Sequence, residues 1–264
     1  MYSILDPRVR EERRAGMCAL AVMAKAPRAG RVKTRLQPPL TAEEAAALNV
    51  CFLRDTAANI AGVCDELSGN GESGAAGMVC YTPVGDESAF DGLLPEGFAL
   101  IAQRGDGFGE RLRAAAEDIL SCGFGAVCLI DSDSPTLPAS ALREAVNELR
   151  RPGDRVVIGG SEDGGYYLIG LKRAEPRVFE RIAWSTASVY AQTVEQARET
   201  EMELVELPQW YDVDDAATLA VLERELLLDE RPGFAAVEGF DARWTREFLA
   251  ERLRAREVNA EERA

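Results

Sequence analysis

Two aspartates, Asp131 and Asp133, directly follow an apolar segment at residues 125–130. In an extended chain, side chains two positions apart point to the same side, so both carboxylates can face one point in space. Pro135 lacks a backbone N–H and stops the strand just beyond them. Carboxylates at a strand end suit a hard divalent cation whose shell is completed by phosphate oxygens. An isolated pair of this kind is more often a loop that caps turns, so the metal interpretation needs support from the rest of the chain.

A second pair of carboxylates with the same spacing follows the apolar segment 202–207. Asp212 and Asp214 lie just before a stretch with helical periodicity, where an aspartate can also serve as a helix N-cap. A second acidic strand end would complete the cation site begun by Asp133. The two strand ends therefore predict a site for Mg²⁺ or Mn²⁺, with Asp131, Asp133, Asp212 and Asp214 as its candidate ligands.

A basic loop follows the first apolar segment, 17–24, and positions 13–42 contain no acidic residue. Both common phosphate-loop motifs, G-x-G-x-x-G and G-x-x-x-x-G-K-[ST], are missing. Five cations within residues 25–35 can nevertheless wrap a di- or triphosphate, whereas a merely solvated loop would leave like charges repelling one another. A later Gly-rich turn at 105–109 precedes a helix, whose free N–H groups favour anions. The predicted nucleotide and phosphate ligands are Lys25, Arg28, Gly30, Lys33, Thr34, Arg35 and Arg111.

A third segment, 160–167, lies between two apolar stretches and contains a Gly-Gly pair. The glycines supply the positive φ of a hairpin turn, which is a complete structural explanation. They also allow close backbone approach, so the adjacent carboxylates can reach an acceptor. We predict Asp163 as the acceptor-side general base or orienting group. The other predicted acceptor-side residues are Glu162, Gly164, Gly165, Tyr166 and Trp184, although a core position would explain the tryptophan equally well.

Composition excludes several kinds of chemistry. The chain has no histidine, which removes Ser-His and Cys-His nucleophiles and most catalytic zinc sites. Its net charge of −15 argues against nucleic acid or an anionic membrane as a partner. The six cysteines form no C-x-x-C pair and read as reduced core thiols. The N-terminus is charged, with no apolar signal segment, and no apolar run is long enough to span a bilayer, so we expect a cytoplasmic protein.

The elements that must position these residues alternate along the chain. Strand-like apolar segments are predicted at 17–24, 76–82, 97–102, 125–130, 155–159, 166–171 and 202–207. Helical periodicity is found at 41–64, 108–121, 139–150, 186–199, 214–228 and 241–256. Such alternation is typical of an α/β fold with a mostly parallel sheet covered by helices on both faces.

We expect one principal domain. Residues 1–16 form a charged extension, residues 17–230 the principal domain, and residues 231–264 a helical extension that packs on the same body or contacts a second copy of the chain. The Gly/Ser-rich stretch 68–77 reads as a surface connection, too short to join separate domains.

Taken in order, the motifs resemble a bacterial glycosyltransferase-like family of GT-A type, whose members are associated with radical-SAM, selenium-domain or arsenosugar pathways. The segments that carry the resemblance are K-A-P-R-A-G-R-V-K-T-R-L, G-D-G-F-G-E-R-L, I-D-S-D-S-P-T-L, E-D-G-G-Y-Y-L-I-G-L, W-S-T and D-V-D-D. The same layout is similar to the wider nucleotide-diphospho-sugar transferase superfamily, which includes guanylyltransferases. The resemblance implies a Rossmann-like GT-A fold, a nucleotide over the first-strand loop, and a divalent cation on Asp133 and Asp214. The chain departs from the family at Asp131, where many relatives have glycine, and at 215–218, where the family's late motif continues D-T-P-x-D.

The expected function is therefore a metal-dependent transfer from an activated nucleotide. The leading version is glycosyl transfer from a nucleotide-diphospho-sugar to a small acceptor. One alternative is transfer of a nucleotidyl group from an NTP to a phosphorylated small acid, which the many cations of the first loop favour. A second alternative is a nucleotide-binding module without turnover. The expected partners are these small molecules, with a homodimer as a further candidate and with neither nucleic acid nor membrane.

Overall fold

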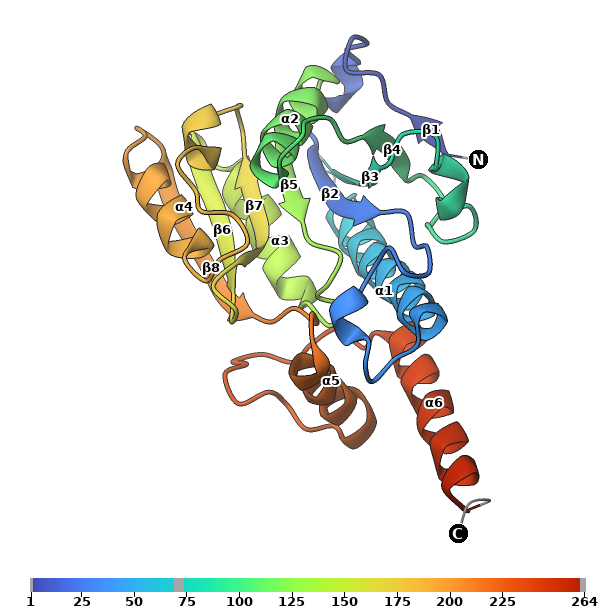
Figure 1. Cartoon of the computed structure of the whole chain (residues 1–264). Coiled ribbons are helices and arrows are strands. Elements are labelled where there is room, and N and C mark those ends of the chain that lie inside the picture. Colours follow the sequence, from blue (N-terminus) through green and yellow to red (C-terminus); the bar gives the residue numbers. More distant parts are fainter. Residues whose placement is uncertain (1, 69–73, 262–264) are drawn as a thin grey trace.

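The computed structural model describes residues 2–68 and 74–261, so part of the 68–77 connection lies outside the described residues. Within these ranges the strands form one eight-stranded sheet in the order β1-β4-β3-β2-β5-β7-β6-β8 (Figure 1). All neighbouring strands are parallel except those beside β7, which is antiparallel to β5 and β6. The strands are β1 (Ser3–Ile4), β2 (Cys18–Lys25), β3 (Ala75–Thr82), β4 (Ala99–Ala102), β5 (Ala126–Ile130), β6 (Arg155–Ser161), β7 (Tyr166–Leu171) and β8 (Glu203–Trp210).

Helices cover both faces of this sheet (Figure 1). One face packs against α1 and α3, and α5 and α6 extend the same hydrophobic core; the other face packs against α2 and α4. The helices are α1 (Ala42–Ser68), α2 (Phe108–Ser121), α3 (Ala139–Arg150), α4 (Val189–Arg198), α5 (Ala216–Leu228) and α6 (Arg243–Glu261). The predicted mostly parallel α/β sheet with two covered faces is confirmed. Each predicted helix and strand is present within a few residues of its expected bounds, whereas β1 was not anticipated because it is only two residues long.

Strand β2 shows how the sequence builds the two cores. Its alternate side chains Cys18, Leu20, Val22 and Ala24 face the α1/α3 side, and Ala19 and Ala21 face the α2 side. A strand whose residues are apolar on both sides is buried from both faces, as parallel strands generally are. The catalytic candidates therefore lie at the strand ends, because the strand interiors are occupied by packing.

The chain after β5 and the chain after β8 meet through a backbone hydrogen bond. Strand β8 is at the sheet edge, separated from β5 by β6 and β7. The chain leaving β8 returns across these strands, and the Val213 N–H donates to the Asp133 carbonyl oxygen over 2.9 Å. This bond places the acidic segment 212–215 beside the acidic segment 131–134. No helix among the described residues has the length and apolarity needed to cross a membrane.

Helix α6 begins on a carboxylate supplied by α1. Both Asp55 oxygens accept backbone N–H groups of α6, from Trp244 at 3.1 Å and from Thr245 at 2.9 Å, and the Thr245 hydroxyl donates at 2.6 Å. Asp55 is fully buried. Because it accepts these N–H groups, it acts as an N-cap of α6 that another helix provides. The C-terminal extension is thus fixed to the body at its first turn.

We predict that Asp55→Ala lowers the free energy of unfolding by about 1–3 kcal/mol, because three donors at a buried helix start lose their acceptor. Chemical denaturation measures the change. Asp65→Ala, on the exposed side of the same helix, is the control and should change stability by less than about 0.5 kcal/mol. Equal stability of the two variants would contradict the capping role.

Asp55 also predicts a pH dependence of stability. Burial raises its pKa from 3.8 to about 6, although the hydrogen bonds from Thr245 and Trp244 oppose the rise. The folded protein therefore binds more protons than the unfolded chain between pH 4 and 6. The stability contributed by this protonation is complete below about pH 4 and is lost as the pH rises through about 6. Relative to Asp55→Asn, wild-type stability should fall by about 2–3 kcal/mol from pH 4 to pH 7 in denaturation series; a rise would contradict the assignment.

Candidate active site

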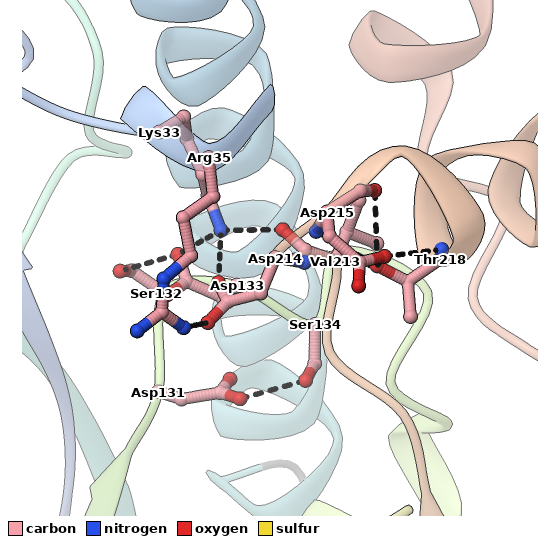
Figure 2. Close-up of polar contacts among 10 residues, drawn as sticks. All are labelled: Lys33, Arg35, Asp131, Ser132, Asp133, Ser134, Val213, Asp214, Asp215 and Thr218. Atoms are coloured by element: carbon pink, nitrogen blue, oxygen red, sulfur yellow. Dashed lines mark hydrogen bonds and ion pairs between the residues drawn. The ribbon is translucent and has the colours of Figure 1, made fainter. Parts of the chain in front are cut away.

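The centre of the candidate site is the ammonium group of Lys33 between two carboxylates (Figure 2). Its Nζ lies 2.8 Å from Asp133 Oδ1 and 3.2 Å from Asp214 Oδ1, and it donates to the Val213 carbonyl over 2.7 Å. The Lys33 side chain is only 4% exposed. The Lys33 ammonium thus contacts both predicted metal-binding aspartates, which are 81 residues apart along the chain.

Local backbone structure directs Lys33 inward. Its φ of 48° is in the left-handed region, just before a short 3₁₀ helix at Thr34–Leu36. The ammonium group lies 5.3 Å from the centre of the Phe52 ring on α1. Burial of the ammonium lowers its pKa, but the charges of Asp133 and Asp214 outweigh this and raise it above the ordinary value. Lys33 is therefore a buried, charged side chain that the two carboxylates stabilise.

Asp214 is available to the site because its neighbour caps the helix. Asp215 accepts the backbone N–H groups of Ala217 and Thr218, each at 2.9 Å, and begins α5 (Figure 2). Asp214 instead faces Lys33, and Arg35 Nη1 lies 3.7 Å from its Oδ2. The two interpretations of the D-V-D-D motif, helix cap and acidic site, therefore apply to different aspartates.

Two further aspartates, Asp131 and Asp212, line one cavity together with this pair. Asp131 accepts a hydrogen bond from the Ser134 hydroxyl at 2.7 Å (Figure 2). Burial and the charge of Asp133 raise the pKa of Asp131 well above its usual range. Burial, together with Asp163 and Asp214, raises the pKa of Asp212 to about 7. The raised pKa values show that additional negative charge is unfavourable at this place, so a bound cation would be stabilising there.

The residues present fit a divalent cation that shares its shell with a substrate. The available donors are carboxylate oxygens, which Mg²⁺ and Mn²⁺ prefer. No group of three or more Asp, Glu, Cys or His side chains in the described ranges surrounds one point closely enough to hold a metal alone. Sites for Mg²⁺ commonly use one or two carboxylates and complete the shell with phosphate and water. Asp133 and Asp214 match that donor set, and the Lys33 ammonium contacts both carboxylates.

Two adjoining cavities open on either side of these carboxylates. The first has a volume of about 240 Å³, and the second about 450 Å³. Both are lined by Arg35, Asp133 and Asp214, so they share one wall. Their charges differ: the first has four basic side chains against two aspartates, whereas the second has five aspartates against Arg35.

The first cavity contains most, but not all, of the predicted phosphate ligands. Lys25, Lys33, Thr34 and Arg35 line it. The other three lie elsewhere: Arg28 forms an ion pair with Asp86, Gly30 provides a turn with φ of 69°, and Arg111 donates to the Gly105 carbonyl at 3.2 Å. The residues that line the cavity differ from the other three in the direction of their side chains, which the composition of the loop does not reveal. Asn49 and Ser132 also line the cavity, although the sequence analysis did not select them. The position of Ser132 between two site aspartates could have indicated it, whereas no sequence pattern indicated Asn49.

The segment 160–167 is a hairpin and also borders the second cavity. It joins β6 to β7, so the structural explanation of the glycines holds. Gly164 has φ of 89°, and a Cβ there would lie 2.1 Å from the Ala187 carbonyl oxygen. This close approach fixes the turn against the chain before α4. Asp163 accepts the Gly165 N–H at 2.7 Å, and both residues line the cavity.

Only some of the remaining acceptor-side candidates line the second cavity. Tyr166 and Trp184 line the second cavity, whereas the Glu162 side chain is exposed and does not. Phe108, which the sequence analysis did not select, packs edge-to-face on Trp184 with ring centres 5.5 Å apart and also lines the cavity. Its signal was its place at the first turn of α2, directly after the Gly-rich turn. The second cavity thus has aromatic walls from α2 and from the loop before α4.

Comparisons with known proteins agree with this architecture. A family model described as an uncharacterized protein conserved in bacteria, DUF2064, matches residues 69–186. A solved structure from Desulfovibrio desulfuricans G20, provisionally named a nucleotide-diphospho-sugar transferase, is 31% identical, with a TM-score of 0.72; the match covers 90% of this chain and 98% of that one.

Two more distant structures are also similar. CMP:2-keto-3-deoxy-manno-octonic acid synthetase, solved with CTP, is 12% identical with a TM-score of 0.48, and the match covers 81% of this chain and 100% of that one. The 4-diphosphocytidyl-2C-methyl-D-erythritol synthase of Anaerococcus prevotii DSM 20548 is 8% identical with a TM-score of 0.49, covering 80% and 99%. No curated protein sequence gave a significant match. With 31% identity to the Desulfovibrio protein over 90% of its own length, the chain belongs to the same family as that protein, and its residues 69–186 match the DUF2064 model.

Proposed function

We propose that this protein transfers a glycosyl group from a nucleotide-diphospho-sugar to a small hydroxyl-bearing acceptor, with a divalent cation. The observation that carries the proposal is the pair of adjoining cavities with opposite charge, which share Asp133, Asp214 and Arg35. A nucleotide-sugar fits this pair of cavities, since its anionic diphosphate suits the basic cavity and its neutral sugar is not repelled by the acidic one. The name of the Desulfovibrio relative supports the same donor class. The association with radical-SAM, selenium-domain or arsenosugar pathways stays a prediction.

In this proposal the first cavity holds the diphosphate. Lys33 and Arg35 supply charge-assisted hydrogen bonds to phosphate oxygens, and Lys25 adds charge at the end of β2. Asp133 and Asp214 would hold the cation, which neutralises the charge of the departing diphosphate. The contacts of Lys33 with both aspartates keep these charges balanced before the donor binds.

The second cavity takes the sugar and the acceptor. Asp163 faces it from the hairpin between β6 and β7 and can accept the proton of the attacking hydroxyl. Trp184 and Phe108 offer apolar ring surface to the carbon faces of a sugar. The glycosyl group then moves to the acceptor oxygen, and a nucleoside diphosphate leaves.

Nucleotidyl transfer from an NTP is the second candidate. The four basic side chains of the first cavity favour it, because they match the charge of a triphosphate. The second cavity is less suited to it, since Arg35 is its one basic side chain and a phosphorylated acid acceptor needs cationic partners. This difference supports glycosyl transfer as our leading proposal. The third candidate, a nucleotide-binding module without turnover, would use the first cavity alone, because it needs no acceptor.

A thermal-shift panel of NTPs and nucleotide-diphospho-sugars, each with and without Mn²⁺, tests the donor class, because a ligand that binds only the folded state raises the melting temperature. We expect the largest Mn²⁺-dependent shift with a nucleotide-sugar. Product analysis then separates the candidates: release of a nucleoside diphosphate supports glycosyl transfer, and release of pyrophosphate supports nucleotidyl transfer. Binding with neither product would leave the module without turnover.

The basic loop gives a further prediction. Lys33→Met should weaken nucleotide binding about 10- to 100-fold, the range expected for losing a charge-assisted hydrogen bond, and should reduce its salt sensitivity. Titration calorimetry at two salt concentrations measures both. Arg28→Met removes a cation from the same loop but outside the cavity, so its affinity should stay close to wild type. Equal losses in both variants would show that only the overall charge of the loop matters.

A further inference from the structure

The Lys33 ammonium group is surrounded by three oxygen atoms at the wall of the first cavity (Figure 2). Its Nζ lies 2.8 Å from Asp133 Oδ1, 3.2 Å from Asp214 Oδ1 and 2.7 Å from the Val213 carbonyl oxygen. An ammonium has three N–H donors and no acceptor, so these three contacts use every donor that it has. In this arrangement Lys33 has no hydrogen bond left to offer to a phosphate.

The same three oxygens form a donor set for a divalent cation. Carboxylate and carbonyl oxygens are the ligands that Mg²⁺ and Mn²⁺ prefer. The Val213 carbonyl adds a third protein oxygen to the two carboxylates, and the Val213 N–H holds the two chain segments together through its bond to the Asp133 carbonyl. Because two positive charges repel each other strongly at such short range, the ammonium and a divalent cation compete for one place.

The first cavity offers the ammonium an alternative partner once an anion is bound. Lys33 lines this cavity together with Lys25, Arg31 and Arg35, whose charges attract phosphate. The stem of a lysine is a flexible chain of four carbons, so the ammonium can turn from the carboxylates to a phosphate without a change of the backbone. The phosphate then compensates the charge of the ammonium, and a divalent cation compensates the charge of the carboxylates.

We infer that Lys33 is an exchangeable counter-ion, whose ammonium occupies the cation position until nucleotide phosphates draw it away and a divalent cation replaces it on Asp133, Asp214 and the Val213 carbonyl. The inference rests on the proposed function and adds to it a coupling between its two ligands. Mn²⁺ alone binds weakly, and each ligand raises the affinity of the other by the same factor. The exchange also means that the two carboxylates always have a cationic partner.

Mn²⁺ binding to the nucleotide-free protein, followed by electron paramagnetic resonance, tests the competition. Lys33→Met keeps an unbranched apolar stem beside Phe52 but removes the ammonium, so it should bind Mn²⁺ at least about 10-fold more tightly than wild type. Adding Asp214→Asn to Lys33→Met should remove that gain, because the ion loses one of its two carboxylates. Unchanged or weaker Mn²⁺ affinity in Lys33→Met would overturn the inference.

Arg35→Met is the matched control. It removes the same charge from the same loop, and Arg35 Nη1 lies 3.7 Å from Asp214 Oδ2, but the Arg35 side chain is 76% exposed. Its Mn²⁺ affinity should stay within about 3-fold of wild type, because exposed ion pairs contribute little. A gain as large as that of Lys33→Met would show that only overall charge matters and would overturn the inference. Lys33→Gln, which keeps a donor for one carboxylate, should show the same gain and replaces Lys33→Met if that variant does not fold.

Titrations of Mn²⁺ in the presence of UDP or GDP test the exchange itself. In wild type, nucleotide should raise the Mn²⁺ affinity about 100-fold, and Asp214→Asn should remove most of this rise. If the Mn²⁺ affinity with nucleotide does not depend on Asp214, Lys33 never leaves the carboxylates and the inference is wrong. If wild type binds neither nucleotide, the proposed function fails, whereas the nucleotide-free comparison still decides whether the ammonium holds the cation position.

Discussion

Replacement of Asp163 by asparagine should reduce turnover at least about 100-fold while donor binding changes little. Asparagine keeps the size of the side chain and an oxygen that can accept the Gly165 N–H, so the hairpin geometry is preserved. It removes the basic charge that would take a proton from the acceptor hydroxyl. A general base typically contributes about 10²–10⁴-fold to the rate, which sets the expected loss.

Steady-state kinetics with the donor identified by the thermal-shift panel measures this effect, and calorimetry measures donor affinity separately. Glu162→Gln is the control because Glu162 is adjacent in the turn, but its side chain does not line the cavity. The control should keep nearly full turnover. If Asp163→Asn is as active as wild type, Asp163 is only a hairpin residue, and a loss confined to Glu162→Gln would move the acceptor base to that neighbour.

Replacement of Asp133 by asparagine should remove the metal-dependent part of nucleotide binding, by at least about 100-fold. Loss of a group that only supports a metal ligand costs about 10- to 100-fold, so loss of a direct ligand should reach the upper end. Asparagine is preferred to alanine because Asp133 also contacts the buried ammonium of Lys33. An amide oxygen can still accept that hydrogen bond, so the fold should be retained.

Binding of Mn²⁺ followed by electron paramagnetic resonance, with and without nucleotide, measures this loss directly. Asp214→Asn should behave in the same way, because Asp214 contacts the same ammonium. Asp215→Asn is the control, since Asp215 caps α5 and does not face the site; asparagine is also a good N-cap. Metal-dependent binding that survives in both Asp133→Asn and Asp214→Asn would place the cation elsewhere.

The order of the elements was predictable because it depends on local patterns. Strand β2 alternates between two cores, and Pro135 and the aspartates before it set the end of β5. The start of α1 shows a capping box, in which the Glu44 N–H donates to the Thr41 hydroxyl and the Thr41 N–H to the Glu44 carboxylate. These signals act over a few residues, so they can be read from sequence.

The sequence by itself determined the fold class and the residue types of the site: carboxylates at two strand ends, a basic loop after the first strand, and no histidine. Only the tertiary structure decided which of these groups meet. Lys33, which has a left-handed backbone and precedes a short 3₁₀ helix, turns inward to Asp133 and Asp214, whereas Arg28 turns away to Asp86. Asn49 joins the site because α1 packs beneath the loop, a long-range contact with no local signal. Spacing along the chain fixes direction only within one element, and packing between elements fixes the rest.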